Sequence, residues 1–311
     1  MAKSTALLQP EPSSSAVVET PHPPVSYRPF FLGAGILLAI FALPLAQLAR
    51  FSLHSDLYSH IVLIPLVSGY FVWLKRRQLP HPAKADTKVA VIAAFIGACF
   101  GVGYIVALLK GGAPAEDQHA LAAGAFVSAT IAVVAATLGR PILKAVAFPL
   151  GFLVFMSPIP TAVIPLIELF LQHGSAAVAY ALFKLIGTPV YNDQLLFILP
   201  GFSMQVAPQC SGIHSSLALF ITSVAAGYLF LESPRRRAVL ALAVIPLALL
   251  RNGFRVFVIG ELCVRISPDM INSWVHKQGG PFFFALSLIP FSVLLYVLFR
   301  LDRRAARSKQ A

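Results

Sequence analysis

The sequence predicts an all-α integral membrane protein, built as a polytopic bundle of about eight transmembrane helices. Hydrophobic residues make up 58% of the 311 positions and charged residues only 12%, against about 25% charged in a typical soluble domain. Several apolar runs approach the ~20 residues that an α-helix needs to cross a bilayer. The Lys and Arg residues gather in short clusters between these runs, which is typical of membrane proteins.

Eight stretches are expected to span the membrane. They are 29–49, 58–74, 88–109, 119–138, 142–157, 210–231, 238–260 and 281–299. A ninth apolar stretch, 160–186, carries polar residues at helical spacing and predicts an amphipathic helix at the interface or packed re-entrantly. Residues 187–209 alternate apolar and polar side chains around a Pro-Gly pair, which predicts a short outer hairpin.

The distribution of basic residues predicts the orientation in the membrane. The ends of the chain and the loops on their side hold 17 of the 24 Lys and Arg residues, and the opposite loops hold 5. Basic loops stay in the cytoplasm. We therefore expect a multi-pass protein of the cell inner (plasma) membrane with both termini cytoplasmic.

Three segments are expected along the chain. Residues 1–27 are rich in Pro and Ser and lack the apolar run of a signal peptide, so they predict a disordered cytoplasmic tail. Residues 28–302 form the transmembrane domain, and 303–311 form a basic cytoplasmic tail.

Composition argues against metal and nucleic-acid chemistry. The three cysteines make no CxxC pair and no HxxxH pair occurs, so no metal site, cofactor or disulfide framework is predicted. The net charge of +12 would favour nucleic-acid binding in a soluble protein. Here it follows the membrane topology, and the expected partners are membrane lipids, with no nucleic acid.

Two arginines lie inside the seventh predicted span. Arg251 and Arg255 are four residues apart and so share one helix face. A guanidinium at the bilayer centre costs at least about 2.5 kcal/mol, so both should face a polar cavity. Alternatively, they form a structural pair that bonds carbonyl groups or Glu261.

Cys210 opens the sixth predicted span at its outer end. The free N–H groups and dipole of a helix N-terminus stabilise a thiolate, which makes Cys210 a candidate nucleophile. A buried, inert thiol is the ordinary alternative for a lone cysteine. A disulfide with Cys263, on the same outer side, is a further alternative.

Three histidines are expected near the same outer surface. His276 lies in the loop before the last span, where its imidazole is a candidate general base, or simply a solvated loop residue. His60 begins the second span and His214 follows Cys210 by four residues. These two are candidates to line the cavity or to bond a neighbouring helix. Cys210, Arg255 and His276 together supply attack, charge stabilisation and proton transfer, as acyl transfer requires.

These residues resemble the exosortase/archaeosortase family over most of the chain beyond the tail. The segment QCSGIHSS at 209–216 is similar to the family's Cys-Ser-Gly motif, and NGFR at 252–255 to its Asn-x-x-Arg motif. His276 matches the third family residue. The segments YSHIVLIPLVSGYFVWLKRR at 58–77 and MSPIPTAVIPLIELFLQ at 156–172 resemble its supporting segments.

The resemblance implies a membrane-embedded cysteine transpeptidase-like enzyme without a cofactor. It would cleave exported proteins at a C-terminal signal made of a short motif, a transmembrane helix and a basic end, and transfer them to a cell-surface acceptor. Cys210 would form the acyl-thioester, Arg255 would donate a proton or stabilise the oxyanion, and His276 would complete the triad. Arg251, His214, His60, Asn252 and Ser211 are the expected supporting residues.

Two positions depart from the family pattern. His214 stands where the family often has Arg, and Ile61 where it often has Gly. The first change leaves open which histidine is the base. Two other functions remain open on the residues alone. One is a membrane transporter or lipid- or polysaccharide-handling protein that binds an anion with Arg251 and Arg255, and the other is a non-catalytic scaffold.

Overall fold

The computed structural model describes residues 27–208, 211–274 and 279–307. Cys210 and His276 lie outside the described residues. The long helices are α1 (Arg28–Leu53), α3 (Thr87–Lys110), α4 (Ala115–Ala145), α6 (Ile164–Leu185), α7 (Ile213–Phe230), α9 (Val244–Arg265) and α11 (Gly280–Arg307). The shorter elements are α2 (Leu63–Lys75), α5 (Ala147–Phe152), α8 (Pro234–Leu242) and the 3₁₀ turns η1 (Ser59–Val62), η2 (Arg76–Gln78), η3 (Leu153–Met156) and η5 (Pro268–Asn272).

The all-α polytopic fold is confirmed. Seven helices are long and apolar enough to cross a membrane: Arg28–Leu53, Thr87–Lys110, Ala115–Ala145, Ile164–Leu185, Ile213–Phe230, Pro234–Arg265 and Gly280–Ala305. The chain is therefore a multi-pass membrane protein. Many large apolar side chains are exposed on the outer faces of these helices, which is expected where the surrounding solvent is lipid.

The predicted number and nature of the spans need correction in three places. The predicted span 58–74 contains η1 and the 13-residue helix α2, and 142–157 is divided between the end of α4, α5 and η3. A non-helical Gly139 and an internal Pro141 distort this part of α4, because proline removes a helix hydrogen bond. In contrast, 160–186 holds one unbroken 22-residue helix, α6, which the polar residues led us to interpret as interfacial or re-entrant.

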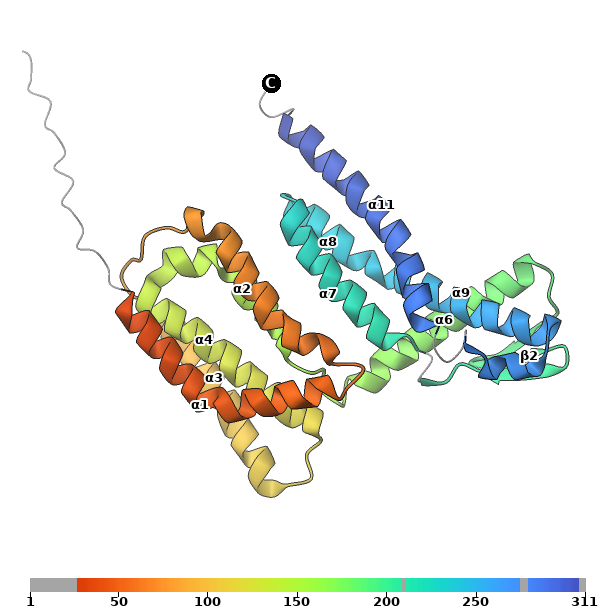
Figure 1. Ribbon diagram of the computed structural model, residues 1–311, viewed down its shortest axis with the longest axis horizontal. Helices are drawn as coiled ribbons and strands as arrows, with labels where there is room; N and C mark the ends of the chain where they lie inside the picture. Colours follow the sequence, from red (N-terminus) through yellow and green to blue (C-terminus); the bar gives the residue numbers. More distant parts are fainter. Residues whose placement is uncertain (1–26, 209–210, 275–278, 308–311) are drawn as a thin grey trace, which may run out of the picture.

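The helices form two groups in Figure 1. Helices α1 to α5 make one bundle, and α6 to α11 make the other. Helix α7 joins them, since Leu217, Ile221, Val224 and Tyr228 pack into the core of the first bundle. In the second group α6 and α9 run side by side toward a small sheet at the far end.

That sheet confirms the predicted hairpin and extends it by one strand. Strands β1 (Tyr191–Asp193), β2 (Leu196–Leu199) and β3 (Phe202–Gln205) pair antiparallel in the order β1-β2-β3. Pro200 and Gly201 make the second turn, and Gly201 has φ +71°, as a Pro-Gly turn requires. Phe197 and Met204 are buried against α6 and α9, so the sheet is anchored to both helices.

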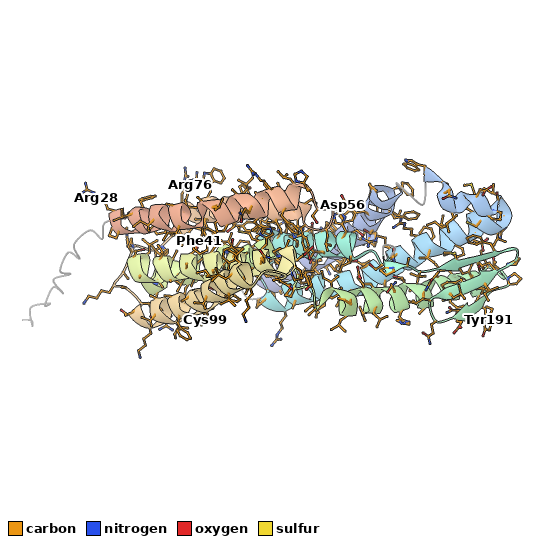
Figure 2. The ribbon with its side chains drawn as sticks, turned by 90° about the horizontal axis from the view of Figure 1, so that it is seen from below. Arg28, Phe41, Asp56, Arg76, Cys99 and Tyr191 are labelled. Carbon is orange, nitrogen blue, oxygen red and sulfur yellow. The ribbon has the colours of Figure 1, made fainter. Side chains whose placement is uncertain are left out.

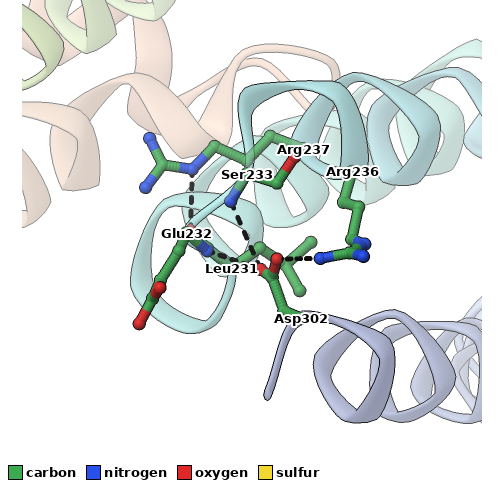
Figure 3. A network of polar contacts seen from close by, with 6 residues as sticks. All are labelled: Leu231, Glu232, Ser233, Arg236, Arg237 and Asp302. Atoms are coloured by element: carbon green, nitrogen blue, oxygen red, sulfur yellow. Dashed lines mark hydrogen bonds and ion pairs between the residues drawn. The ribbon is translucent and has the colours of Figure 1, made fainter. Parts of the chain in front are cut away.

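The basic helix ends meet at the opposite end of the molecule. Asp302 of α11 accepts hydrogen bonds from the backbone N–H of Glu232 (2.6 Å) and Ser233 (3.3 Å) and pairs with Arg236. Figure 3 shows this carboxylate at the start of α8. It therefore accepts hydrogen bonds from the backbone donors that directly precede α8.

An aromatic contact ties the second bundle's basic end to the first bundle. The rings of Tyr228 and Phe148 stack with centroids 3.7 Å apart. The Lys75 ammonium lies 4.9 Å from the Tyr228 ring and the Arg237 guanidinium 5.3 Å from it. A cation that lies above an aromatic ring is held there electrostatically. Because Lys75 ends α2, Tyr228 is near the end of α7 and Arg237 is near the start of α8, these three helix ends share one side of the molecule.

We expect Asp302→Ala to destabilise the protein. The change removes a charged acceptor from two backbone donors and one arginine, at a cost of about 2 kcal/mol. Thermal unfolding of the purified full-length protein in detergent should show a midpoint lower by about 5 °C. The exposed Asp56 supplies the control. An equal shift of the midpoint in Asp56→Ala would refute a stabilising role of the Asp302 contacts.

Candidate functional site

The candidate site begins where β3 ends. Gln172 of α6 donates from Nε2 to the carbonyl oxygen of Val206 at 2.8 Å, and both residues are buried. The backbone N–H of Ser211 donates to the Pro208 carbonyl at 2.9 Å. The segment that carries Cys210 is therefore held at both of its described ends.

A left-handed glycine starts α7 immediately after this segment. Gly212 has φ +75°, a conformation that costs other L-residues roughly 1–2 kcal/mol. A Cβ atom there would lie 3.1 Å from both Arg251 Nη2 and Asn252 Oδ1. The position therefore needs glycine for its backbone conformation, and there is little space for a side chain.

Arg251 holds the start of α7 against α9. Its Nη2 donates to the Gly212 carbonyl and to Ser216 Oγ, both at 3.3 Å, and the residue is buried. Its Nη1 is buried and has no hydrogen-bond partner among the described residues. The structural alternative for Arg251, a bond to a carbonyl, is thus observed, while one nitrogen remains available.

Asn252 links α9 to α6 and to the segment before α7. Its Nδ2 donates to Ser175 Oγ of α6 at 3.0 Å and to the Ser211 carbonyl at 3.2 Å. Close packing makes this possible, since a Cβ on Gly253 would lie 2.5 Å from Val178 and 2.8 Å from the Ser175 carbonyl oxygen. The amide therefore fixes the segment before α7 to both α6 and α9.

Arg255 lies one helical turn beyond Arg251 and is half-buried. It lines a small cavity of about 30 Å³ together with Asn252 and residues of β3, α9 and η5. The other lining residues are Met204, Gln205, Val206, Val256, Ile259 and Ile271. Asn252 thus connects the Arg251 contact with the Arg255 cavity.

Two of the candidate histidines, His60 and His214, lie near one another at the start of α7. His60 is in η1, outside the seven candidate spanning helices, and His214 is exposed in the first turn of α7. Burial lowers the pKa of His60 and the nearby His214 lowers it further, whereas the carbonyl groups of Leu57 and Phe155 raise it. Burial, the largest cause, therefore disfavours the charged form of His60.

Glu261 and Cys263 are the alternative partners that the sequence offers for Arg251 and Cys210. Glu261 bonds Thr188 at 2.5 Å and Arg265 at 2.5 Å, and no bond to Arg251 is seen in the described part of the chain. Cys263 is a free, buried thiol, which does not support a disulfide with Cys210. Within the described ranges no three metal-ligating residues cluster.

The structure thus bonds Ser211 to Asn252 and Gly212 to Arg251, and Arg255 lines the cavity that Asn252 also lines. Gly212 belongs to the Cys-Ser-Gly motif noted in the sequence, whereas Gln172 and Ser175 were not predicted as site residues. The spacing of Gln172 and Ser175, three residues apart in an apolar helix, is the signal that would have placed both on one face.

The arrangement favours negative charge near the start of α7. The N-terminus of an 18-residue helix, the buried Arg251 and the half-buried Arg255 all present positive potential there. In a water-poor environment such groups stabilise a thiolate or an oxyanion more strongly than they would in water.

Comparison with known proteins identifies one family. The family model described as transmembrane exosortase matches residues 51–293, which include every segment that forms the candidate site. Neither the curated proteins nor the solved structures contain a significant match to this chain.

We expect Gly212→Ala to destabilise the protein more than Gly187→Ala does. Both glycines have nearly the same positive φ, +75° and +76°, so the backbone strain is matched at about 1–2 kcal/mol. Only at Gly212 does the added methyl group crowd Arg251 and Asn252, because a Cβ at Gly187 meets open space. Midpoints of thermal unfolding of the two purified variants provide the comparison, and equal midpoints would contradict it.

Proposed function

Because the chain belongs to the transmembrane exosortase family, we propose that it cleaves the C-terminal sorting signals of exported proteins as a cysteine transpeptidase-like enzyme. Family membership supports a protein-sorting role of the transpeptidase type in general. The observation that carries the proposal is the contact of the Ser211–Gly212 segment with Arg251 and Asn252, beside Arg255. This contact places the residues next to the candidate nucleophile among cationic groups.

The proposed reaction starts at Cys210. Its thiolate sulfur attacks the scissile carbonyl carbon, and the C=O electron pair moves to oxygen to form a tetrahedral intermediate. The intermediate collapses, the C–N bond breaks, and the amine leaves with a proton to give an acyl-thioester. Water, or a nucleophile on a cell-surface acceptor, then attacks the thioester and releases the thiolate.

We assign the charge-stabilising role to Arg255 and proton transfer to His276. A guanidinium fork can donate two hydrogen bonds to an oxyanion, which a compact ammonium cannot reproduce. Arg251 supports the site instead, since its Nη2 is engaged by Gly212 and Ser216. Its second terminal nitrogen adds positive potential at the start of α7.

The proposed substrate is an exported protein that ends in a short motif, a transmembrane helix and a basic segment. An enzyme embedded in the membrane can hold such a helix so that its scissile bond lies at a set depth. Positioning of this kind can lower the barrier by several kcal/mol.

We propose that the basic ends lie in the cytoplasm and the candidate site near the outer face of the inner membrane. The contacts of Lys75, Arg236 and Arg237 support this, because they gather basic helix ends on one side. The small sheet lies near the C-terminal end of α9, away from these basic helix ends (Figure 1). The counts of 17 and 5 basic residues agree with this orientation.

We expect Cys210→Ala to abolish processing. The variant lacks the nucleophile, so exported proteins with the tripartite C-terminal signal should accumulate with their tails intact in cells, as measured by mass spectrometry of membrane proteins. Cys99→Ala is the matched control, because Cys99 is an exposed free thiol on α3 (Figure 2). Normal processing by Cys210→Ala would contradict the enzyme assignment and favour a transporter.

We expect Arg255→Lys to reduce the processing rate by about 100-fold while the protein remains in the membrane. Loss of one preorganised oxyanion donor typically costs about 10²–10³-fold in rate. Arg265→Lys is the control on the same helix, because Arg265 is largely exposed and pairs with Glu261. A pulse-chase assay of tail removal provides the rates, and wild-type speed in Arg255→Lys would rule out its proposed role.

A further inference from the structure

Strand β3 has a free edge beside the candidate site. In the β2–β3 ladder Leu196 faces Gln205 and Ile198 faces Ser203. The Val206 N–H donates to the Leu195 carbonyl at 2.9 Å. Hydrogen-bonded and non-bonded pairs alternate in an antiparallel ladder, so residues 202, 204 and 206 bond to β2. The backbone N–H and C=O groups of Ser203 and Gln205 therefore point away from it.

These outward groups have the spacing of a pairing edge. Ser203 and Gln205 are two residues apart, or about 6.8 Å along the strand. Neither backbone amide makes a backbone hydrogen bond outside the ladder within the described residues. Natural proteins usually protect such edges with charged residues, proline or a covering element, whereas Ser203 and Gln205 are uncharged and exposed.

The edge leads directly into the catalytic region proposed above. Gln205, with its neighbours Met204 and Val206, lines the cavity that Arg255 and Asn252 also line. The chain then continues from Val206, which Gln172 holds, to Ser211. A peptide lying along this edge would therefore pass beside Arg255 on its way to the segment that carries the candidate nucleophile.

The other edge of the sheet does not share this position. The register pairs Tyr191 with Ile198 and Asp193 with Leu196, so Asn192 presents its backbone to the outer edge of β1. Figure 2 places the labelled Tyr191 at the outer margin of the molecule. Strand β3 contacts α9, and no residue of β1 is among the described residues that line the Arg255 cavity.

We propose that the extended segment of the substrate, which contains its scissile bond, pairs with β3 as a fourth strand. This inference rests on the proposed function, because it assigns the substrate's binding mode at the same site. Strand addition supplies main-chain hydrogen bonds that hold a peptide extended. An extended backbone exposes the carbonyl to be attacked, whereas a helix keeps its carbonyl groups in internal hydrogen bonds.

The local geometry favours a single peptide strand over a second copy of the sheet. Ile271 of η5 lines the same cavity as Gln205, so η5 borders the space beside β3. The edge itself is short, since β3 has four residues. Pairing therefore covers only a few substrate residues, which matches a short recognition motif.

Proline scanning of the two edges tests the proposal in cells that express the full-length protein. The probe is the exported protein that accumulates uncleaved in the Cys210→Ala strain. Ser203→Pro and Gln205→Pro each remove an N–H from the free edge and leave the β2 ladder bonds intact. We expect each variant to process this protein about fivefold more slowly or worse. Asn192→Pro, the same change on the β1 edge, should process at the wild-type rate within about twofold.

Photo-crosslinking tests the proposal without relying on the proline variants. A benzophenone amino acid at Ser203 in the Cys210→Ala protein should crosslink to the uncleaved substrate at residues just before its transmembrane helix, while one at Tyr191 should not. Absence of the Ser203 crosslink, or wild-type processing by Gln205→Pro, overturns strand addition and leaves the proposed function standing. Normal processing by Cys210→Ala overturns both.

Discussion

The contact between Asn252 of α9 and its partners on α6 and before α7 is the constraint on which the candidate site depends. One amide bonds Ser175 and the Ser211 carbonyl, and the neighbouring Arg251 bonds Gly212 and Ser216. Polar groups in a lipid-surrounded protein must find partners inside the protein. These bonds therefore determine where α7 begins relative to α9.

Close packing of α6 and α9 makes that contact possible and extends its effect to the sheet. Gly253 and Gly260 of α9 leave no room for a Cβ against Ser175, Val178 and Phe183 of α6. The same two helices then bury Phe197 and Met204 of the sheet. A single helix pair thus positions both the start of α7 and strand β3, which explains how a sheet at the end of the molecule comes to border Arg255.

The opposite end of the molecule is organised by charge. Asp302 binds the backbone donors just before α8, and the Tyr228 ring contacts Lys75 and Arg237 while it stacks on Phe148. These contacts gather the basic ends of several helices, as the orientation proposed from the sequence requires. The cationic groups at the site are of a different kind, since Arg251 is buried and bonded inside the bundle.

The amino-acid sequence by itself determined the membrane class, the positions of most long helices and the hairpin, and it pointed to Arg251, Asn252 and Ser211 as candidate site residues. It could do so because lipid imposes long apolar runs, and because a buried guanidinium always requires an explanation. Only the tertiary structure decided that 58–74 and 142–157 are shorter or broken helices and that α6 is one continuous helix. Gln172 and Ser175 became site residues only through contacts between segments more than 30 positions apart, and hydrophobic periodicity carries no information on which helix a polar side chain will meet.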